Sequence, residues 1–339
     1  MKDLHPNNTS DSPAARRIAI ESIDRPISQL ALGTAFYKLA IKDECFAMLD
    51  DFLARGGTVL DTGRCYGESE DVLGLWLESR KARAKVVLTT KGGHGDGHGL
   101  VPNDFTATIE RELKTSLERL HTDQVHLYML HRDSPAVPVA QIMNCLNAEL
   151  EKGHARSLGA SNWEYDRIAE ANAYARAHNL QGFSVVSNNL SLAVPKTTFY
   201  PGLVSVDQAG EQWHRQTGIP LIVWSSQARG FFTGRYTPQF CAVPSVARDK
   251  FTARMIEVYC TNDNFERLRR AQELGKQKSG YSAVQIALAW LLHKPFPLIP
   301  IVGPHSKSEL ESCFQALALR LTGLETAWLN LEDRSATGP

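Results

Sequence analysis

Four polar residues follow short apolar runs of the chain, and together they could handle a proton during chemistry at a carbonyl group. Asp61 and Tyr66 follow TVL, Lys91 follows VVLTT, and His131 follows VHLYML. A phenol beside an ammonium, with a carboxylate behind it and an imidazole nearby, makes a proton donor suited to neutral pH. Taken singly, a strand-end Asp often only caps the next helix, and a Tyr near a Lys is often a surface neighbour. Taken together, the four side chains favour an active site.

The elements that would position these side chains alternate between short apolar runs and amphipathic stretches. The runs are apolar on both faces, as parallel strands covered by helices are. The expected strands are residues 30–33, 58–61, 86–90, 125–130, 157–161, 183–187, 221–224 and 298–302. The expected helices are Asp43–Arg55, Ser69–Ser79, Phe105–Leu120, Val139–Lys152, Glu164–His178, Asp207–Gln216, Ser282–His293 and Ser306–Leu317. This alternation predicts an α/β fold, a closed (β/α)8 TIM barrel with its active site at the carboxyl ends of the strands.

Other segments are expected to complete this barrel. Residues 17–23 and 26–32 predict an N-terminal β-hairpin that caps one end. The connections 188–206 and 229–264 exceed usual loop lengths, which predicts long functional loops at the carboxyl-terminal face. No linker or shift in composition divides the chain, so we expect one domain over residues 16–331. The polar residues 1–15 predict a flexible tail, and residues 332–339 a C-terminal tail.

Charge and composition exclude several classes of partner. The 339 residues include 37 basic and 37 acidic side chains, without the basic surface of a nucleic-acid-binding protein. No apolar run has the length of a membrane span, and the N-terminus has no apolar signal-peptide region. The six cysteines are scattered without paired spacing, which is typical of free thiols in a reducing compartment. These features predict a cytoplasmic protein that acts on a small molecule, and they leave the oligomeric state open.

Seven short motifs occur along the chain, each at the end of an expected strand. They are GTAFY (33–37), LDTGRCYG (60–67), TTKGG (89–93), LHRDSP (130–135), GASNW (159–163), WSSQARGFFTG (224–234) and IVGPHSKSEL (301–310). With these motifs in this order, the chain resembles the aldo-keto reductase superfamily from Leu30 to its last helix. The resemblance implies NADP(H) bound across the barrel mouth and the interconversion of a carbonyl and an alcohol. It also implies that Asp61, Tyr66, Lys91 and His131 form the catalytic tetrad, with Tyr66 as general acid and base.

The resemblance also indicates where the cofactor would bind. Ser161 and Asn162 would hold the nicotinamide carboxamide, although the same pair could cap the following helix. Backbone amides of the segment beginning at Trp224 would surround the pyrophosphate, and the helix beginning near Ser306 offers an N-terminal phosphate site. The candidate cofactor contacts are Gly33, Thr34, Ala35, Asp61, Ser161, Asn162, Ser187, Asn188, Trp224, Ser225, Gln227, Arg229, Gly230, Gly303, Ser306, Lys307, Glu309 and Cys313.

Two departures from the family pattern affect these contacts. The Gln that usually follows strand six is replaced by Ser187, with Asn188 and Asn189 next to it. The family often has Gln or Arg near Glu309, Glu near Ser312 and Asn near Cys313, and all three differ here. A glutamate would repel a 2′-phosphate but could bind free ribose hydroxyls, so NAD(H) stays open as an alternative to NADP(H).

Several further expectations concern substrate, metal and alternative functions. The candidate substrate contacts are Phe36, Tyr37, Tyr66, His131, Arg132 and Trp163. The loop HGDGH (94–98) alternates possible ligands, but no further ligand set accompanies it, so we expect no metal. Cys65 is expected to be a packing residue, because the sequence offers it no base partner. Two other functions stay open: a lyase that uses Lys91 to form a Schiff base, and a non-catalytic subunit that binds the cofactor and senses redox state.

Overall fold

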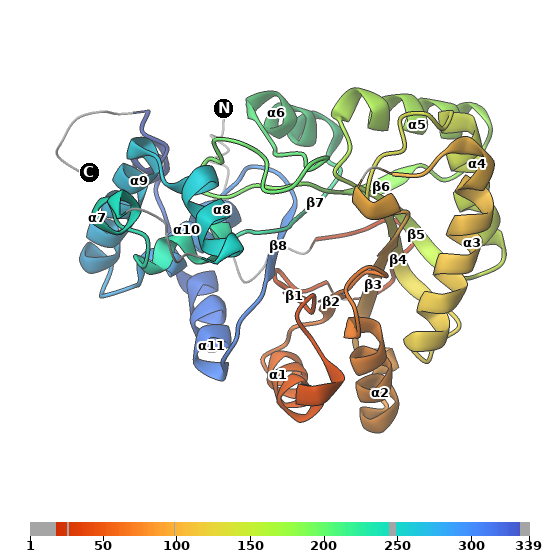
Figure 1. Ribbon diagram of the computed structural model, residues 1–339, viewed down its shortest axis with the longest axis horizontal. Coiled ribbons are helices and arrows are strands. Elements are labelled where there is room, and N and C mark those ends of the chain that lie inside the picture. The colour runs from red at the N-terminus through yellow and green to blue at the C-terminus, as the bar shows by residue number, and fades with distance from the viewer. Residues whose placement is uncertain (1–17, 26, 98, 244–248, 333–339) are drawn as a thin grey trace, which may run out of the picture.

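Eight short parallel strands form a closed barrel in the computed structural model, which describes residues 18–25, 27–97, 99–243 and 249–332 (Figure 1). Each strand pairs with its neighbours in chain order, and β1 pairs with β8 to close the ring. The strands are β1 Ala31–Gly33, β2 Val59–Asp61, β3 Val87–Gly92, β4 Val125–Leu130, β5 Ala155–Ser161, β6 Phe183–Ser187, β7 Leu221–Val223 and β8 Leu298–Val302. The predicted (β/α)8 barrel is therefore confirmed.

Helices cover the outside of this barrel (Figure 1). They are α1 Lys42–Ala54, α2 Ser69–Arg80, α3 Pro102–Arg119, α4 Val139–Glu151, α5 Tyr165–Ala177, α6 Gln208–Thr217, α7 Pro238–Ala242, α8 Lys250–Tyr259, α9 Asn262–Gln277, α10 Ala283–Leu292, α11 Lys307–Gln315 and α12 Gly323–Leu329. Local chemistry sets several helix starts. Pro102 opens α3, where its missing N–H costs nothing, and Ser282 with Gln285 forms a capping box at α10. Within the described residues, no helix is both long enough and apolar enough to span a membrane.

The predicted N-terminal hairpin is wrong. In residues 18–25 and 27–30 the structure has turns and bends but no strand, while residues 17 and 26 lie outside the described part. Ile20 and Ile23 instead pack into the barrel interior with Val59, Val87 and Leu127. Their side chains gain more by filling this apolar opening than by pairing as an exposed ribbon, because burial removes apolar surface from water.

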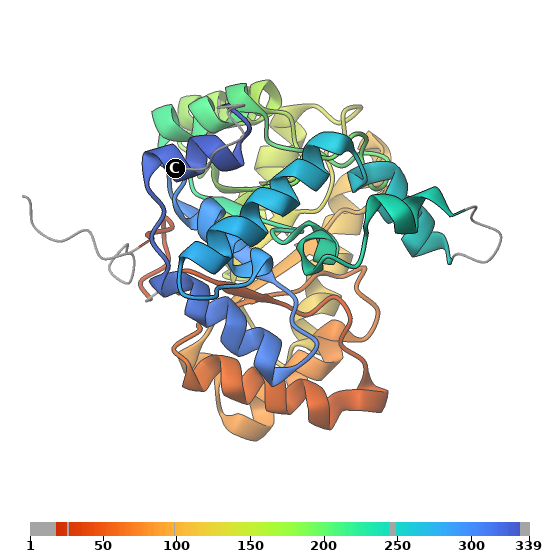
Figure 2. The same cartoon turned by 90° about the vertical axis from the view of Figure 1, so that its left-hand side faces the viewer.

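The predicted connection 229–264 is also more ordered than expected. It contains the 3₁₀ segment η5 at Ala228–Thr233, helices α7 and α8, and the first residues of α9. Helices α7 and α8 project to one side of the barrel (Figure 2). By contrast, residues 188–206 contain neither helix nor strand, which agrees with the prediction of a long loop after β6. The expected N-terminal tail 1–15 lies outside the described residues, as do residues 333–339 of the expected C-terminal tail.

Strand register brings the candidate residues to one end of the barrel. Gly33, Asp61 and Thr89 are aligned across β1, β2 and β3, and Lys91 is aligned with Met129 of β4. Parallel strands all point the same way, so their carboxyl ends share one face of the barrel. The side chains of Asp61 and Lys91, and the loop residues that follow each strand, therefore meet at this face.

Candidate active site

A buried ion pair lies at the centre of this face. Lys91 Nζ lies 2.6 Å from Asp61 Oδ1 and also donates to the carbonyl oxygen of Thr62 at 2.9 Å. Lys91 is 2% exposed and Asp61 3% exposed. The hydroxyl of Thr89 donates a further hydrogen bond to Asp61 Oδ1 at 3.1 Å. Buried charges persist when they are paired and hydrogen-bonded, and this pair satisfies both conditions.

A phenol and an imidazole lie in front of the ion pair. Tyr66 Oη is 3.3 Å from His131 Nε2, and the two rings meet edge to face with their centroids 5.3 Å apart. The ammonium of Lys91 lies 5.3 Å from the centroid of the Tyr66 ring. On the other side of the imidazole, the thiol of Cys65 lies 3.4 Å from His131 Nδ1. The four side chains predicted as a tetrad are thus brought together.

Burial dominates the proton affinities of this cluster. It raises the pKa of the Tyr66 phenol above its ordinary value, although the neighbouring Lys91 acts in the opposite direction. A phenol beside an ammonium is predicted to be a stronger acid than a free phenol, but here the larger desolvation effect reverses the net direction of the shift. Burial, aided by Lys91 and Arg132, holds the pKa of His131 well below its usual range, so its imidazole is neutral near pH 7. Burial also opposes the charge of Lys91, but Asp61, Tyr66 and Cys65 together outweigh it and raise the pKa of Lys91.

A network of buried polar side chains beneath Tyr66 was not predicted from the sequence. Glu70, at the start of α2, is fully buried and accepts a hydrogen bond of 2.7 Å from Thr90, the residue before Lys91. Ser69 lies 2.6 Å from the hydroxyl of Thr34 and 2.7 Å from that of Thr62. The sequence offered one signal, the polar residues of YGESE, which are typical of a helix start. This run does not reveal that Ser69 and Glu70 are buried. This network joins α2 to strands β1, β2 and β3.

Residues at the ends of β5 and β6, and those that follow them, form a second polar group. Ser161 Oγ donates to the carbonyl oxygen of Ser187 at 2.9 Å, and the backbone N–H of Asn162 donates to Asn188 Oδ1 at 2.8 Å. Asn188 Nδ2 also donates to the Trp163 carbonyl at 3.0 Å, so both ends of this amide are engaged within the protein. Ser187 Oγ, in contrast, is buried and has no hydrogen-bond partner.

The segment after β7 has an unusual backbone. Ser225, Ala228, Arg229 and Gly230 all adopt left-handed conformations, with φ values of 51°, 48°, 52° and 86°. Non-glycine residues adopt such angles at a cost of about 1 kcal/mol each or more, and they cluster at functional sites. Successive N–H groups in turn conformations can form a concave anion site. The indole Nε1 of Trp224 is buried here without a hydrogen-bond partner.

The N-terminus of α11 is the third candidate cofactor contact. Ser306 caps this helix, because its side chain accepts a hydrogen bond from the N–H of Glu309. The Glu309 carboxylate accepts a hydrogen bond of 2.7 Å from the N–H of His305. Lys307 is exposed in the first turn, and an added Cβ at Gly303 would meet no atom within 4 Å.

The other candidate cofactor contacts differ in their exposure. Cys313 is 4% exposed, and its sulfur accepts a hydrogen bond from Gln227 Nε2 at 3.6 Å, so this thiol faces the core of the helix packing. Thr34 is fully buried and donates to the Asp61 carbonyl, whereas Ala35 is exposed. Gly33 packs closely against β8, since a Cβ there would lie 2.7 Å from Ile301.

The candidate substrate residues separate into two groups. Phe36 is 67% exposed with its ring 6.1 Å from that of His305, and Arg132 follows His131 at the barrel mouth. Trp163 is instead fully buried in the hydrophobic core, where it packs against Phe183, and Tyr37 packs against the same core. The sequence could not distinguish these cases, because aromatic residues after a strand serve equally as pocket walls and as core.

His94, in the loop expected to alternate metal ligands, lies close to the tetrad. The ring of His94 is 5.1 Å from that of His131. No cluster of three or more His, Cys, Asp or Glu side chains suited to a metal occurs within the described residues, and His98 lies outside them.

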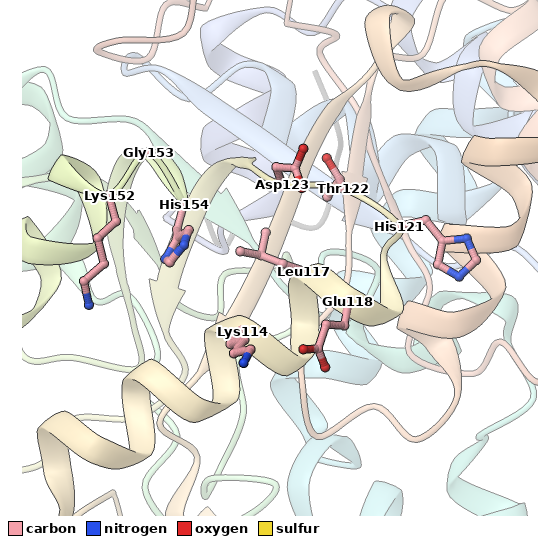
Figure 3. A pocket seen from close by; sticks show the side chains of 9 residues that line it. All are labelled: Lys114, Leu117, Glu118, His121, Thr122, Asp123, Lys152, Gly153 and His154. Carbon is pink, nitrogen blue, oxygen red and sulfur yellow. The ribbon is translucent and has the colours of Figure 1, made fainter.

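A surface hollow of about 560 Å³ lies elsewhere, where α3 and α4 end and β4 and β5 begin (Figure 3). It contains none of the candidate site residues. Its lining is Lys114, Leu117, Glu118, His121, Thr122, Asp123, Lys152, Gly153 and His154. Because these residues precede their strands, the hollow lies at the amino-terminal end of the barrel, away from the tetrad.

Residues 29–329 match the model of the Aldo/keto reductase family. This chain belongs to that family. The match covers the barrel and every residue of the tetrad, and it confirms the family expected from the seven motifs. Curated relatives of this aldo/keto reductase include oxidoreductases, and one of them aligns with most of this chain and with most of its own length.

An uncharacterized oxidoreductase of Bacillus subtilis, YrpG, is 26% identical over 313 residues, which cover 87% of this chain and 89% of the relative. A norsolorinic acid reductase of Aspergillus flavus is 26% identical over 323 residues, covering 90% of this chain and 78% of the relative. Two solved structures share the fold of this aldo/keto reductase. A putative 2,5-diketo-D-gluconic acid reductase B has a TM-score of 0.66 at 23% identity, with 93% of this chain and 91% of the other covered. The thermostable aldo-keto reductase Tm1743 has a TM-score of 0.67 at 19% identity, with 93% and 98% covered.

Proposed function

We propose that this aldo/keto reductase interconverts a carbonyl and an alcohol with NADP(H), using Tyr66 as the general acid and base. The observation that carries the proposal is the contact between Tyr66 Oη and His131 Nε2 at 3.3 Å, with the Lys91–Asp61 ion pair behind the phenol. A substrate oxygen that approaches this pair meets a phenol and a neutral imidazole at once. Both groups can donate a hydrogen bond to it.

The chain's own residues manage the proton. In reduction, Tyr66 donates its proton to the oxygen that gains negative charge. Burial raises the pKa of the phenol, so it is protonated near pH 7, and the nearby Lys91 limits how far burial weakens it as an acid. His131 orients the substrate oxygen and does not compete for the proton, because its own pKa is well below the usual range. Lys91 stabilises the phenolate that remains, and Asp61 holds Lys91 in place.

The residues beyond the tetrad fit a nicotinamide dinucleotide. Ser187 Oγ and Trp224 Nε1 are buried polar atoms without partners, which a ligand can satisfy. Ser161 and Ser187 would hold the carboxamide, the left-handed backbone from Ser225 would hold the pyrophosphate, and Ser306 would hold the adenosine phosphate. When bound, the nicotinamide supplies the hydride.

NADP(H) is preferred over NAD(H) in this proposal. Lys307 is an exposed cation in the first turn of α11, where positive charge and free amides favour a 2′-phosphate. The Glu309 carboxylate is engaged by the N–H of His305, which removes part of the repulsion expected from it.

The alternative of a Schiff-base lyase is disfavoured by the surroundings of Lys91. A Schiff-base lysine must be deprotonated to attack a carbonyl. Lys91 is 2% exposed, pairs with Asp61 at 2.6 Å and has a raised pKa, so its amine stays protonated. A non-catalytic redox sensor would have no need of the Tyr66–His131 contact, which disfavours that alternative as well.

Fluorescence titration of the purified protein with NADPH and with NADH tests the proposal, together with a spectrophotometric assay of aldehyde reduction. We expect tight binding of NADPH, weaker binding of NADH, and aldehyde-dependent oxidation of NADPH. Binding of NADPH without turnover of any aldehyde or ketone would favour the sensor. Failure to bind either nucleotide would refute the proposed function.

A further inference from the structure

Arg132 is a buried guanidinium that the proposed proton chemistry does not use. It is 7% exposed, and its Nη1 donates to the carbonyl oxygen of its neighbour His131 at 2.9 Å. Its Nε is buried without a hydrogen-bond partner. The adjacent acid, Asp133, pairs instead with Arg167 at 3.1 Å. Among the described residues, Arg132 therefore has no carboxylate within ion-pair distance.

Arg229 is a second guanidinium with an unpartnered Nε, although the residue is only half-buried. Its planar group lies over the face of Phe199, 4.2 Å from the ring centroid, and 5.8 Å from the centroid of Tyr200. Its Nε is also buried without a partner, and it makes no ion pair within the described part of the chain. The aromatic face holds the guanidinium in position but leaves its Nε–H unsatisfied.

Both guanidiniums contact the same stretch of the loop after β6. Arg229 contacts Phe199 and Tyr200, and a Cβ added at Gly202 would lie 3.8 Å from Arg132 Nε. Both also interact electrostatically with the Tyr66 phenol. Two positive charges thus lie within electrostatic range of the Tyr66 phenol. Burying charge without a counter-ion is costly, unless a ligand supplies the opposite charge.

We propose that Arg132, assisted by Arg229, binds an anionic group of the substrate, so that the preferred substrates are carbonyl compounds carrying a carboxylate or a phosphate. This inference rests on the proposed function and names its substrate class. Arg132 directly follows His131, so the anion and the carbonyl oxygen are bound by neighbouring residues and belong to one small molecule. The planar fork of an arginine binds either anion through two parallel hydrogen bonds.

Two other roles could explain these arginines. They could lower the pKa of Tyr66 for every substrate alike, or Arg229 could bind the cofactor pyrophosphate from its strained backbone segment. The first role affects neutral and anionic substrates equally. The second affects the affinity for NADPH and not the choice of substrate. These differences define the experiment.

The experiment compares matched aldehydes with the full chain and saturating NADPH. One pair is 2-carboxybenzaldehyde and benzaldehyde, and the other is glyceraldehyde 3-phosphate and glyceraldehyde. We expect kcat/KM to be roughly 10-fold to 100-fold higher for the anionic member of at least one pair, as charge-assisted hydrogen bonds allow. A larger anionic-to-neutral ratio of kcat/KM in the first pair would identify the preferred substrate group as a carboxylate. A larger ratio in the second pair would identify it as a phosphate.

Variants then assign the ratio to its residues. Arg132→Gln is expected to reduce the anionic-to-neutral ratio roughly 10-fold or more, mainly through KM, and Arg132→Lys to restore part of it. Arg176→Gln, an exposed arginine of α5 outside the site, is the matched control and should leave the ratio unchanged. Thermal unfolding of each variant checks that it folds, and Arg132→Lys keeps the test valid should Arg132→Gln fail to do so.

Three results would overturn all or part of the inference without affecting the proposed function. Neutral aldehydes reduced as well as their anionic partners would remove the substrate class while leaving the proposed function intact. A uniform loss for both members in Arg132→Gln would assign Arg132 to Tyr66 alone. An Arg229→Gln variant with weaker NADPH binding and an unchanged ratio would assign Arg229 to the cofactor. If no aldehyde is reduced at all, the proposed function fails, and the inference fails with it.

Discussion

Lys91 Nζ and Asp61 Oδ1 are 2.6 Å apart, and both side chains are almost completely buried. Asp61 is the last residue of β2 and Lys91 lies near the end of β3. The ion pair therefore links two adjacent strands at the face where the candidate active site lies. This link gives the pair a structural role in addition to its chemical one, and the two roles can be measured separately.

Replacing Lys91 by Met should cost both stability and activity. The substitution leaves the Asp61 carboxylate buried without its cation, which typically destabilises a protein by about 3–5 kcal/mol. Urea denaturation would measure the loss. The double variant Asp61→Asn/Lys91→Met should regain much of the stability but none of the activity. Equal stability of the single and double variants would contradict this account of the pair.

Replacing Tyr66 by Phe should remove the proton donor and little else. We expect kcat to fall by roughly 10²-fold to 10⁴-fold, the range of a single general acid. The dissociation constant for NADPH should change little, because the phenol is not among the proposed cofactor contacts. Steady-state kinetics and fluorescence titration provide the two numbers. Unchanged turnover would show that another group donates the proton.

Acid should destabilise the protein through its buried histidines. Burial, with help from Arg83, lowers the pKa of His126 to about 3, and burial lowers that of His214 to about 4. Unfolded histidines titrate near pH 6.5, so below that pH the unfolded state binds more protons than the folded state. Stability should therefore fall as the pH drops from about 6.5 towards 4, by about 1.4 kcal/mol per pH unit for each such histidine.

Urea denaturation at several pH values measures this slope. His126→Gln is expected to reduce the slope of the unfolding free energy against pH by the contribution of one proton, about 1.4 kcal/mol per pH unit. This holds even if the variant is less stable than the wild type at pH 7. An identical slope in wild type and His126→Gln would contradict the assignment.

The first turn of α11 should set the preference between the two nucleotides. Lys307→Gln should weaken NADPH binding roughly threefold to tenfold while changing NADH binding little, because only NADPH carries the 2′-phosphate. Lys85→Gln removes an exposed charge that precedes β3, at the other end of the barrel, and serves as the control. Equal weakening of both nucleotides by Lys307→Gln would place this lysine near a phosphate that both share.

The sequence was sufficient to predict the bounds of elements that a short run of residues defines. The predicted bounds of β4, β6 and β8 agree with the structure, because apolar runs ended by polar residues mark buried parallel strands. The hairpin was wrong because alternating apolar residues such as Ile18 and Ile20 fit a ribbon as well as they fit a barrel opening. Only the three-dimensional position of the opening distinguishes the two.

In the candidate site too, the sequence could not predict features that depend on three-dimensional packing. The residue types of the tetrad and their places at strand ends could be predicted, but the direction of the Tyr66 pKa shift could not. That direction depends on whether burial or the Lys91 charge has the larger effect. Glu70 was missed for a related reason, since its burial beneath Thr90 comes from the packing of α2 against β3.

The packing of Ile20 and Ile23 has a consequence for where this protein begins as a folding unit. Similarity to the family starts at residue 29, yet these two side chains complete the hydrophobic interior from outside that range. A truncated version starting at Gln29 would retain all eight strands but admit water to Val59 and Val87 through the uncovered opening. The residues needed to keep water out of the barrel interior therefore extend beyond the range of family similarity. Expression of the barrel should include residues from Ile18 onward.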